Sequence, residues 1–264
     1  MNIATYLQRI INLFLVPSKA FDDLKEGVSF KDWLIPLLIV SAALIILPLF
    51  FRDVSFYEAE ERLRIHEQRF ANDSEVPEEH RAQIEERLSD AHEKIDDTRE
   101  NPLALRNLWG YPLIPVMLFL MTAFFSAILL MIGNFGMGGQ VKFFQLFTMV
   151  MMTYLIAGNG FFMNMIPGVG TLELLVKTPL IIIKESTDML FSPGLLFENI
   201  DSFFKQFLNQ LDVFRIWGMV VMGFGFAKLY NTSTATGIIS VGLPWLILVS
   251  IGAALVNANS LATG

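Results

Sequence analysis

Polar side chains within apolar stretches are the residues of this chain that could do chemistry. Asn159 and Asn164 lie in an uncharged run, and Glu173 and Lys177 follow in the next apolar segment. Polar groups inside a membrane often line a route for ions or protons, but they also hydrogen-bond neighbouring helices. Glu173 and Lys177 are four residues apart, so one helical face would pair them. These four residues are the candidate intramembrane polar site, either as a route or as helix contacts.

The other reactive residue types form no pattern of an enzyme. His66, His80 and His92 are 14 and 12 residues apart, which gives no preformed metal-binding pair such as i, i+4. The lack of cysteine excludes thiolate catalysis and cysteine metal sites. No Ser, His and Asp set falls on one side of the predicted membrane, and the glycine pairs lack the strand and lysine of a phosphate loop. We expect no catalytic, cofactor-binding or metal site and no nucleic-acid partner.

Composition indicates an all-α integral membrane protein. Of 264 residues, 53% are hydrophobic and 17% are charged, and the 36 residues after Lys228 carry no charge. A soluble domain would need polar surface at such an end. A span needs about 20 apolar residues at 1.5 Å each. Apolar runs predict five transmembrane helices, at 33–51, 111–132, 143–166, 213–230 and 237–256, and only the fourth carries charges, Arg215 and Lys228 near its ends. The first lies within 32–52, and the other four form a bundle within 109–264.

Two further segments belong beside these spans. Residues 1–31 hold short amphipathic pieces, which predict helices that lie in the membrane interface or pack on the spans. In the segment 171–212, Lys177 and Pro179 interrupt the apolar run. A lysine at the bilayer centre costs about 2.5–3.5 kcal/mol on insertion scales, so we expect an interfacial or re-entrant segment there. Arg215, near the start of the fourth span, is expected to snorkel to the interface.

Residues 53–108 form a hydrophilic module between the first two spans. Sixteen of the 26 acidic residues lie between Asp53 and Glu100. Apolar residues recur at helical spacing in two stretches, 57–71 and 78–97, and predict an antiparallel helical hairpin outside the membrane. Its apolar seam is only three or four layers deep, so it needs the membrane part, a partner or a second copy for stability. The candidate partner contacts are Leu63, Phe70, Ile84 and Leu88.

The distribution of basic residues predicts the orientation. The first 31 residues carry four Lys and Arg residues, the turn before the third span carries Lys142, and the C-terminal tail carries none. The positive-inside rule therefore puts the N-terminus in the cytoplasm, and residues 53–108 and the C-terminus on the other side. The run 10–16 is short and meets Lys19, so we expect no signal peptide.

Four stretches, taken in order, resemble the Yip family of multi-span membrane proteins, named for Ypt/Rab-interacting proteins. They are PSKAFDDLK at 17–25 with WLIPL at 33–37, GGQVKFFQ at 138–145, IPGVGTL at 166–172 and FRIWGMVVMGFGFA at 214–227. The resemblance implies a cytoplasmic N-terminus and no catalytic activity. It also implies Rab GTPase contacts in eukaryotic members and association with ABC-type exporters for some bacterial ones. Here the hairpin is an insertion and the acidic N-terminal motif is missing, which favours a bacterial inner-membrane protein.

Two functions follow as hypotheses. The first is a non-enzymatic membrane adaptor or scaffold, whose hairpin binds a partner protein, such as an exporter component, or a second copy. The second is a small channel or transporter that uses the polar groups of the third span and of the segment after it. Five spans do not divide into equal halves and no internal repeat is detected, which favours the adaptor.

Overall fold

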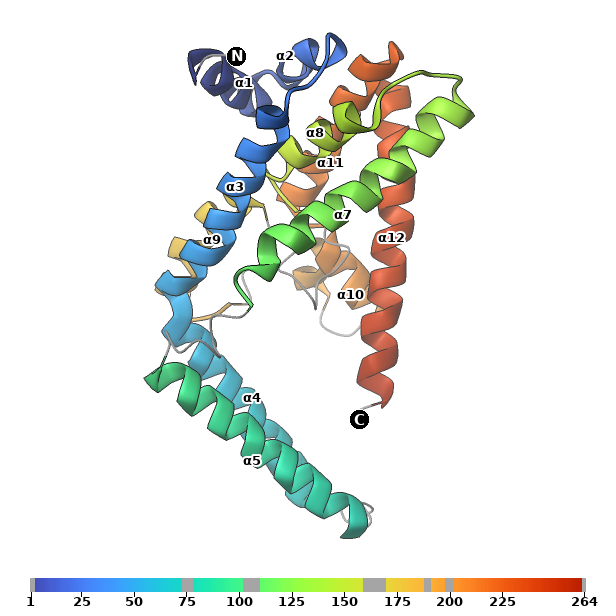
Figure 1. Ribbon diagram of the computed structural model, residues 1–264. Coiled ribbons are helices and arrows are strands. Elements are labelled where there is room, and N and C mark those ends of the chain that lie inside the picture. The colour runs from blue at the N-terminus through green and yellow to red at the C-terminus, as the bar shows by residue number, and fades with distance from the viewer. Residues whose placement is uncertain are drawn as a thin grey trace. The chain divides into compact units, whose positions relative to one another are not determined.

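The computed structural model describes residues 3–72, 78–101, 110–158, 170–187, 191–197 and 202–262, and all of their regular elements are helices (Figure 1). Asn159 and Asn164 lie outside the described residues. The chain divides into two compact units. One comprises Met1–Leu44, Ile114–Val176 and Leu190–Gly264, and the other comprises Ile45–Leu113 and Lys177–Met189.

Four described helical stretches are long and apolar enough to cross a membrane. They are Phe30–Gln68, Leu113–Gly136, Val213–Tyr230 and Thr234–Leu255. Their elements are α3 (Phe30–Ile46), η2 (Leu47–Phe51) and α4 (Arg52–Asn72), then α7 (Leu113–Leu130) with the π-helical η3 (Met131–Gly136), then α11 (Val213–Tyr230) and α12 (Thr234–Ala262). The chain is therefore an all-helical protein with several apolar helices typical of membrane embedding.

The N-terminal segment packs within the first unit. It forms α1 (Ile3–Leu15), α2 (Pro17–Ala20) and η1 (Asp22–Lys25), and Pro17 stands in the first turn of α2, where a missing N–H is tolerated. The side chains of Leu13, Phe21 and Leu24 are fully buried. These three side chains are covered by protein, whereas Leu7, Ile11 and Leu15 of α1 are exposed. α2 contacts α11 (Figure 1).

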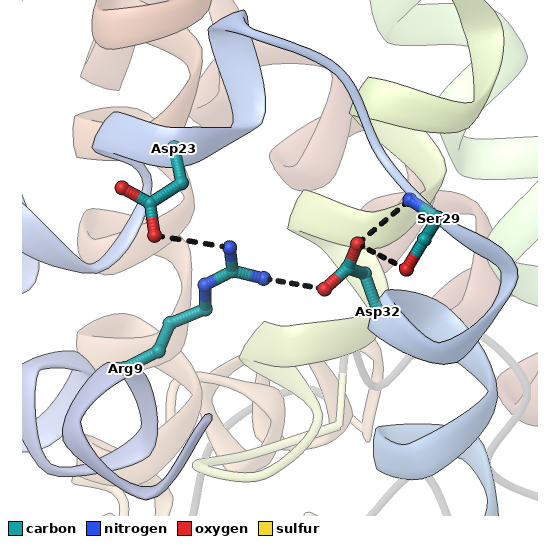
Figure 2. Close-up of polar contacts among 4 residues, drawn as sticks. All are labelled: Arg9, Asp23, Ser29 and Asp32. Atoms are coloured by element: carbon teal, nitrogen blue, oxygen red, sulfur yellow. Dashed lines mark hydrogen bonds and ion pairs between the residues drawn. The ribbon is translucent and has the colours of Figure 1, made fainter. Parts of the chain in front are cut away.

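A buried arginine, Arg9, links this segment to the start of α3 through hydrogen bonds. Arg9 donates from Nη1 to Asp32 Oδ1 at 3.0 Å and from Nη2 to Asp23 Oδ2 at 3.2 Å (Figure 2). The other Asp32 oxygen accepts from the backbone N–H of Ser29 at 2.7 Å and from its hydroxyl at 2.8 Å. Arg9 and Asp32 are each 6% exposed, so they form a buried ion pair. The hydrogen bonds from Ser29 and the contact with Asp23 offset the cost of burying these charges.

α11 and α12 are antiparallel neighbours that approach closely. A Cβ built on Gly237 would lie 2.3 Å from the backbone oxygen of Gly223, so only glycine fits there. Such small residues allow close packing of apolar helices. α11 ends at Asn231, which adopts a left-handed conformation with φ of 51°.

The region between α7 and α11 differs from the predicted single helix over 143–166. α8 (Phe143–Thr153) ends after 11 residues, and α9 (Thr171–Lys184) follows with 14. The short η4 (Pro193–Leu196) and the amphipathic α10 (Ser202–Gln210) come next, and α10 packs on α12. The physical reason for the early end of α8 lies in its contacts with α9, at the candidate site.

In the second unit, α4 and α5 (Glu78–Glu100) lie side by side in opposite directions. Glu60 Oε1 pairs with Arg99 Nη1 at 2.6 Å, and Glu67 Oε1 pairs with His92 Nε2 at 2.9 Å. The hydrogen bond to Glu60 raises the pKa of the Arg99 guanidinium. These pairs set the register of the two helices.

Candidate functional site

The helices α8 and α9 are joined end to end by backbone hydrogen bonds. The N–H groups of Thr171, Leu172 and Glu173 donate to the carbonyls of residues 154, 155 and 156 at 3.0, 3.0 and 3.1 Å. The first N–H groups of a helix and the last carbonyls of another have no partner within their own helix. Here the first N–H groups of α9 donate to the carbonyls that follow α8. The backbone hydrogen bonding of α8 therefore continues into α9.

Gly170 makes this junction possible. A Cβ at Gly170 would lie 2.2 Å from the Cα of Ala157 and 2.3 Å from its nitrogen. Two backbone segments therefore cross at a distance that no other residue permits. The Gly170 N–H also donates to Glu173 Oε2 at 3.3 Å, and its carbonyl accepts from the Leu174 N–H at 2.9 Å.

Glu173 and Arg215 bring opposite charges together at the junction. Glu173 is fully buried and Arg215 is 6% exposed, and Arg215 Nε lies 3.9 Å from Glu173 Oε1. Arg215 Nη1 also donates to Gln210 Oε1 at 2.6 Å. The expectation that Arg215 snorkels therefore differs from the structure, because Arg215 points inward to a buried carboxylate and amide.

The neighbouring Asp212 ties a loop to the start of α11. It is fully buried and accepts from the Phe214 N–H at 2.9 Å, as a helix N-cap does. Its second oxygen accepts from the Phe191 N–H at 3.1 Å. Asp212 thus fixes the first turn of α11, which carries Arg215.

The space beside the junction is small. A cavity of about 10 Å³ lies between Thr153 of α8, Arg215 of α11 and Trp245 of α12. That volume suits a single water molecule. Among the described residues, the cavity beside the ion pair is thus about the size of one water molecule.

Of the four predicted intramembrane polar residues, Glu173 and Lys177 are described. Both lie on α9 and are buried, with Lys177 7% exposed. The structure brings Glu173 together with Arg215, which sequence reasoning did not include in the site. The signal for Arg215 was its place two residues inside an apolar run, just after an aspartate that can cap a helix.

A groove of about 520 Å³ runs between α4 and α5 in the second unit. Its lining residues are Ser55, Glu58, Ala59, Arg62, Leu63, His66, Ala91, Lys94, Ile95 and Thr187. Leu63, a predicted partner contact, is therefore in the groove. The predicted contacts Phe70, Ile84 and Leu88 are half-buried outside it, and the Phe70 ring lies 5.2 Å from the Arg81 guanidinium carbon.

Glu58, the acidic residue that lines this groove, already has several hydrogen-bond partners. Glu58 accepts from the Thr187 N–H at 2.7 Å, from the Thr187 hydroxyl and from the Ser186 hydroxyl at 3.0 Å. It also lies 3.5 Å from Arg62 Nη2. The Arg62 side chain is 66% exposed, and with Lys94 and His66 it gives the groove a mainly basic rim.

No protein-family model, no curated protein and no solved structure matches this chain. What its residues do has to follow from their own contacts. Within the described ranges, no group of three or more His, Asp or Glu side chains is arranged to hold a metal ion. The junction and the groove are therefore the two candidate sites.

Proposed function

We propose that this chain is a non-enzymatic multi-span membrane adaptor that resembles the Yip family and binds a partner protein through the helical hairpin of α4 and α5. The groove between these helices carries the proposal. Its floor holds Leu63, Ala91 and Ile95, and its rim holds exposed basic side chains. A component of an ABC-type exporter is the partner that the resemblance favours.

The chemistry of the groove specifies the partner segment. Apolar anchors of a partner helix would fit the floor, and its carboxylates would meet Arg62 and Lys94 at the rim. Complementary charge speeds association and sets the register of the bound segment. The expected ligand is an acidic amphipathic helix of the partner.

A five-span topology in a bacterial inner membrane completes the proposal. α8 and α9, with 11 and 14 residues, are joined into one ladder, and about 25 residues at 1.5 Å each exceed the ~30 Å hydrocarbon layer. Together with the four longer stretches, this composite helix would be the fifth crossing, in place of a single helix over 143–166 followed by an interfacial or re-entrant segment. The N-terminus is then cytoplasmic, and the hairpin and C-terminus are extracytoplasmic.

Crosslinking and affinity recovery of the tagged full chain from its native membrane test the adaptor function. We expect a specific partner to be recovered with the unaltered chain and lost with Arg62→Glu/Lys94→Glu. The matched control, Arg64→Glu/Arg87→Glu, makes the same charge change on exposed side chains that do not line the groove. Equal recovery with both double variants would remove the groove from the function. Recovery of a second copy in place of another protein would make the hairpin a self-association surface.

The buried pair of Glu173 and Arg215 beside a helix break favours a channel or transporter as the second candidate, since interrupted helices form many transporter sites. Two features weigh against it: the facing helix ends bond each other, and the adjacent cavity suits one water. Solute flux into liposomes that is lost in Lys177→Ala would support transport. Absence of flux for every solute tested would leave the adaptor.

A further inference from the structure

A separate polar cavity of about 290 Å³ lies where α11 ends and α12 begins. The N-terminal segment contributes Ser18 and Lys25, and the two helices and their turn contribute the rest. The remaining lining residues are Phe224, Ala227, Lys228, Asn231, Thr232 and Thr234. We call this the α11–α12 cavity. All of its residues belong to the first unit.

The lining of the α11–α12 cavity is rich in hydrogen-bond donors. Lys25 and Lys228 bring ammonium groups, and Ser18, Thr232 and Thr234 bring hydroxyls. In the described contacts, Lys228 Nζ pairs with Asp22 Oδ1 at 2.7 Å and Lys25 Nζ donates to Asn231 Oδ1. An ammonium group has three donors, so each lysine retains two N–H groups for a further acceptor.

The cavity lies at the level where two apolar helices leave the membrane. Lys228 is in the last turn of α11, and Thr234 is the first residue of α12. Both helices are long and apolar enough to span. Phe224 lies one turn deeper than Lys228 and gives the cavity an apolar wall on the membrane side. In a bilayer crossed by these two helices, the donors would lie at headgroup depth, with the apolar wall of Phe224 on the membrane side.

The charges around the cavity favour an anion. Two lysines face one aspartate, Asp22, whose side chain is 48% exposed. The first turn of α12 adds the positive end of a 29-residue helix. Basic pockets between membrane helices bind phospholipid headgroups in this way.

We propose that the α11–α12 cavity binds a phosphate group, such as the headgroup of an anionic phospholipid presents, through Lys25 and Lys228. The hydroxyls of Ser18, Thr232 and Thr234 complete the contacts to the phosphate oxygens. The N-terminal segment is part of this site, so a bound headgroup would link it to the ends of α11 and α12. The site is independent of the hairpin groove.

Binding to the purified full chain in a neutral detergent tests the proposal. The probes are dioctanoyl phosphatidylglycerol, dioctanoyl phosphatidylcholine and sodium phosphate, titrated by calorimetry at constant ionic strength. We expect phosphatidylglycerol to bind best and Lys25→Ala/Lys228→Ala to weaken it about thirtyfold, from the loss of two basic side chains. The matched control Lys19→Ala/Lys31→Ala removes the same charge from exposed residues outside the cavity and is expected to change affinity less than about twofold.

A second variant distinguishes loss of the binding site from a folding defect. Asp22→Asn removes the carboxylate that competes for Lys228 and is expected to tighten phosphatidylglycerol binding about threefold, which misfolding cannot imitate. Lysine-dependent binding of sodium phosphate, without binding of the lipid, would assign the site to free phosphate. No binding of any probe, or lipid binding that is equal in the lysine variant and its control, would overturn the proposal.

Discussion

Arg9 and Arg215 are two charged residues that are buried in this apolar protein, and each is 6% exposed. Arg9 reaches two carboxylates at 3.0 and 3.2 Å, so its charge is closely neutralised. Arg215 has a looser ion pair at 3.9 Å and relies on its hydrogen bond with Gln210. A buried charge that loses its partner is far more costly than the pair itself. Arg215 and Glu173 are thus the residues through which α9 and α11 depend on each other.

The first prediction concerns this pair. Arg215→Ala removes the cation that lies 3.9 Å from the buried Glu173 carboxylate and the donor to Gln210, and should lower the free energy of unfolding by about 3–5 kcal/mol. In Arg215→Ala/Glu173→Gln the neutral amide removes the buried charge that Arg215 faced, so a large part of the loss should return. Unfolding of the purified chain in mixed detergent and SDS measures both. Arg64→Ala, which breaks an exposed pair, is the control and should cost less than about 1 kcal/mol. A loss for Arg215→Ala no larger than the control contradicts a structural role for the pair.

At the scale of elements, the junction of α8 and α9 explains how an interrupted helix is tolerated in an apolar protein. Unpaired backbone groups are costly in a membrane, so a broken helix needs other partners for its ends. The carbonyls of residues 154–156 and the N–H groups of residues 171–173 are those partners for each other. The two helices therefore act as one composite element.

The second prediction tests this junction through Gly170. Gly170→Ala places a Cβ against the backbone of Ala157, which cannot rotate away as a side chain can. We expect a loss of at least about 3 kcal/mol in the free energy of unfolding, and faster hydrogen exchange of the amides at 171–173. Gly136→Ala is the matched control, because a Cβ there meets nothing within 4 Å. Unchanged protection of those amides in Gly170→Ala would show that the helix ends do not need this approach.

At the scale of the whole molecule, the proposed function depends on sidedness. The adaptor needs its groove on the side of the membrane where the partner is found. The basic residues of the N-terminal segment favour the cytoplasm for that end, and the five spans that we propose would place the two termini on opposite sides. Single introduced cysteines can measure this directly, because the chain has none of its own.

The third prediction is a labelling pattern. Ser89→Cys on α5 and Lys19→Cys on α2 both introduce an exposed thiol. A membrane-impermeant maleimide should label Ser89→Cys in intact cells with an opened outer membrane, and Lys19→Cys only after lysis. Labelling of both after lysis is the control for reactivity. The reverse pattern would place the hairpin in the cytoplasm, and labelling of both before lysis would place them on one side.

The amino-acid sequence alone determined several of the helices, because hydropathy and helix breakers act locally. The predicted run 213–230 is α11, and the predicted helices 57–71 and 78–97 fall within α4 and α5. Pro48 stands in η2, where α-helical geometry gives way to a 3-10 turn. Whether a segment forms a helix depends on residues a few positions apart in the chain, so it can be predicted from the sequence.

Only the tertiary structure decided which polar groups meet. The sequence spacing singled out Glu173 and Lys177 on one helical face, and the folded chain adds Arg215 of α11 beside Glu173. The junction of α8 and α9 and the cavity shared by the N-terminal segment with α11 and α12 likewise join residues far apart in the chain. Hydropathy says that a residue is buried, but helix packing decides which neighbour satisfies its charge.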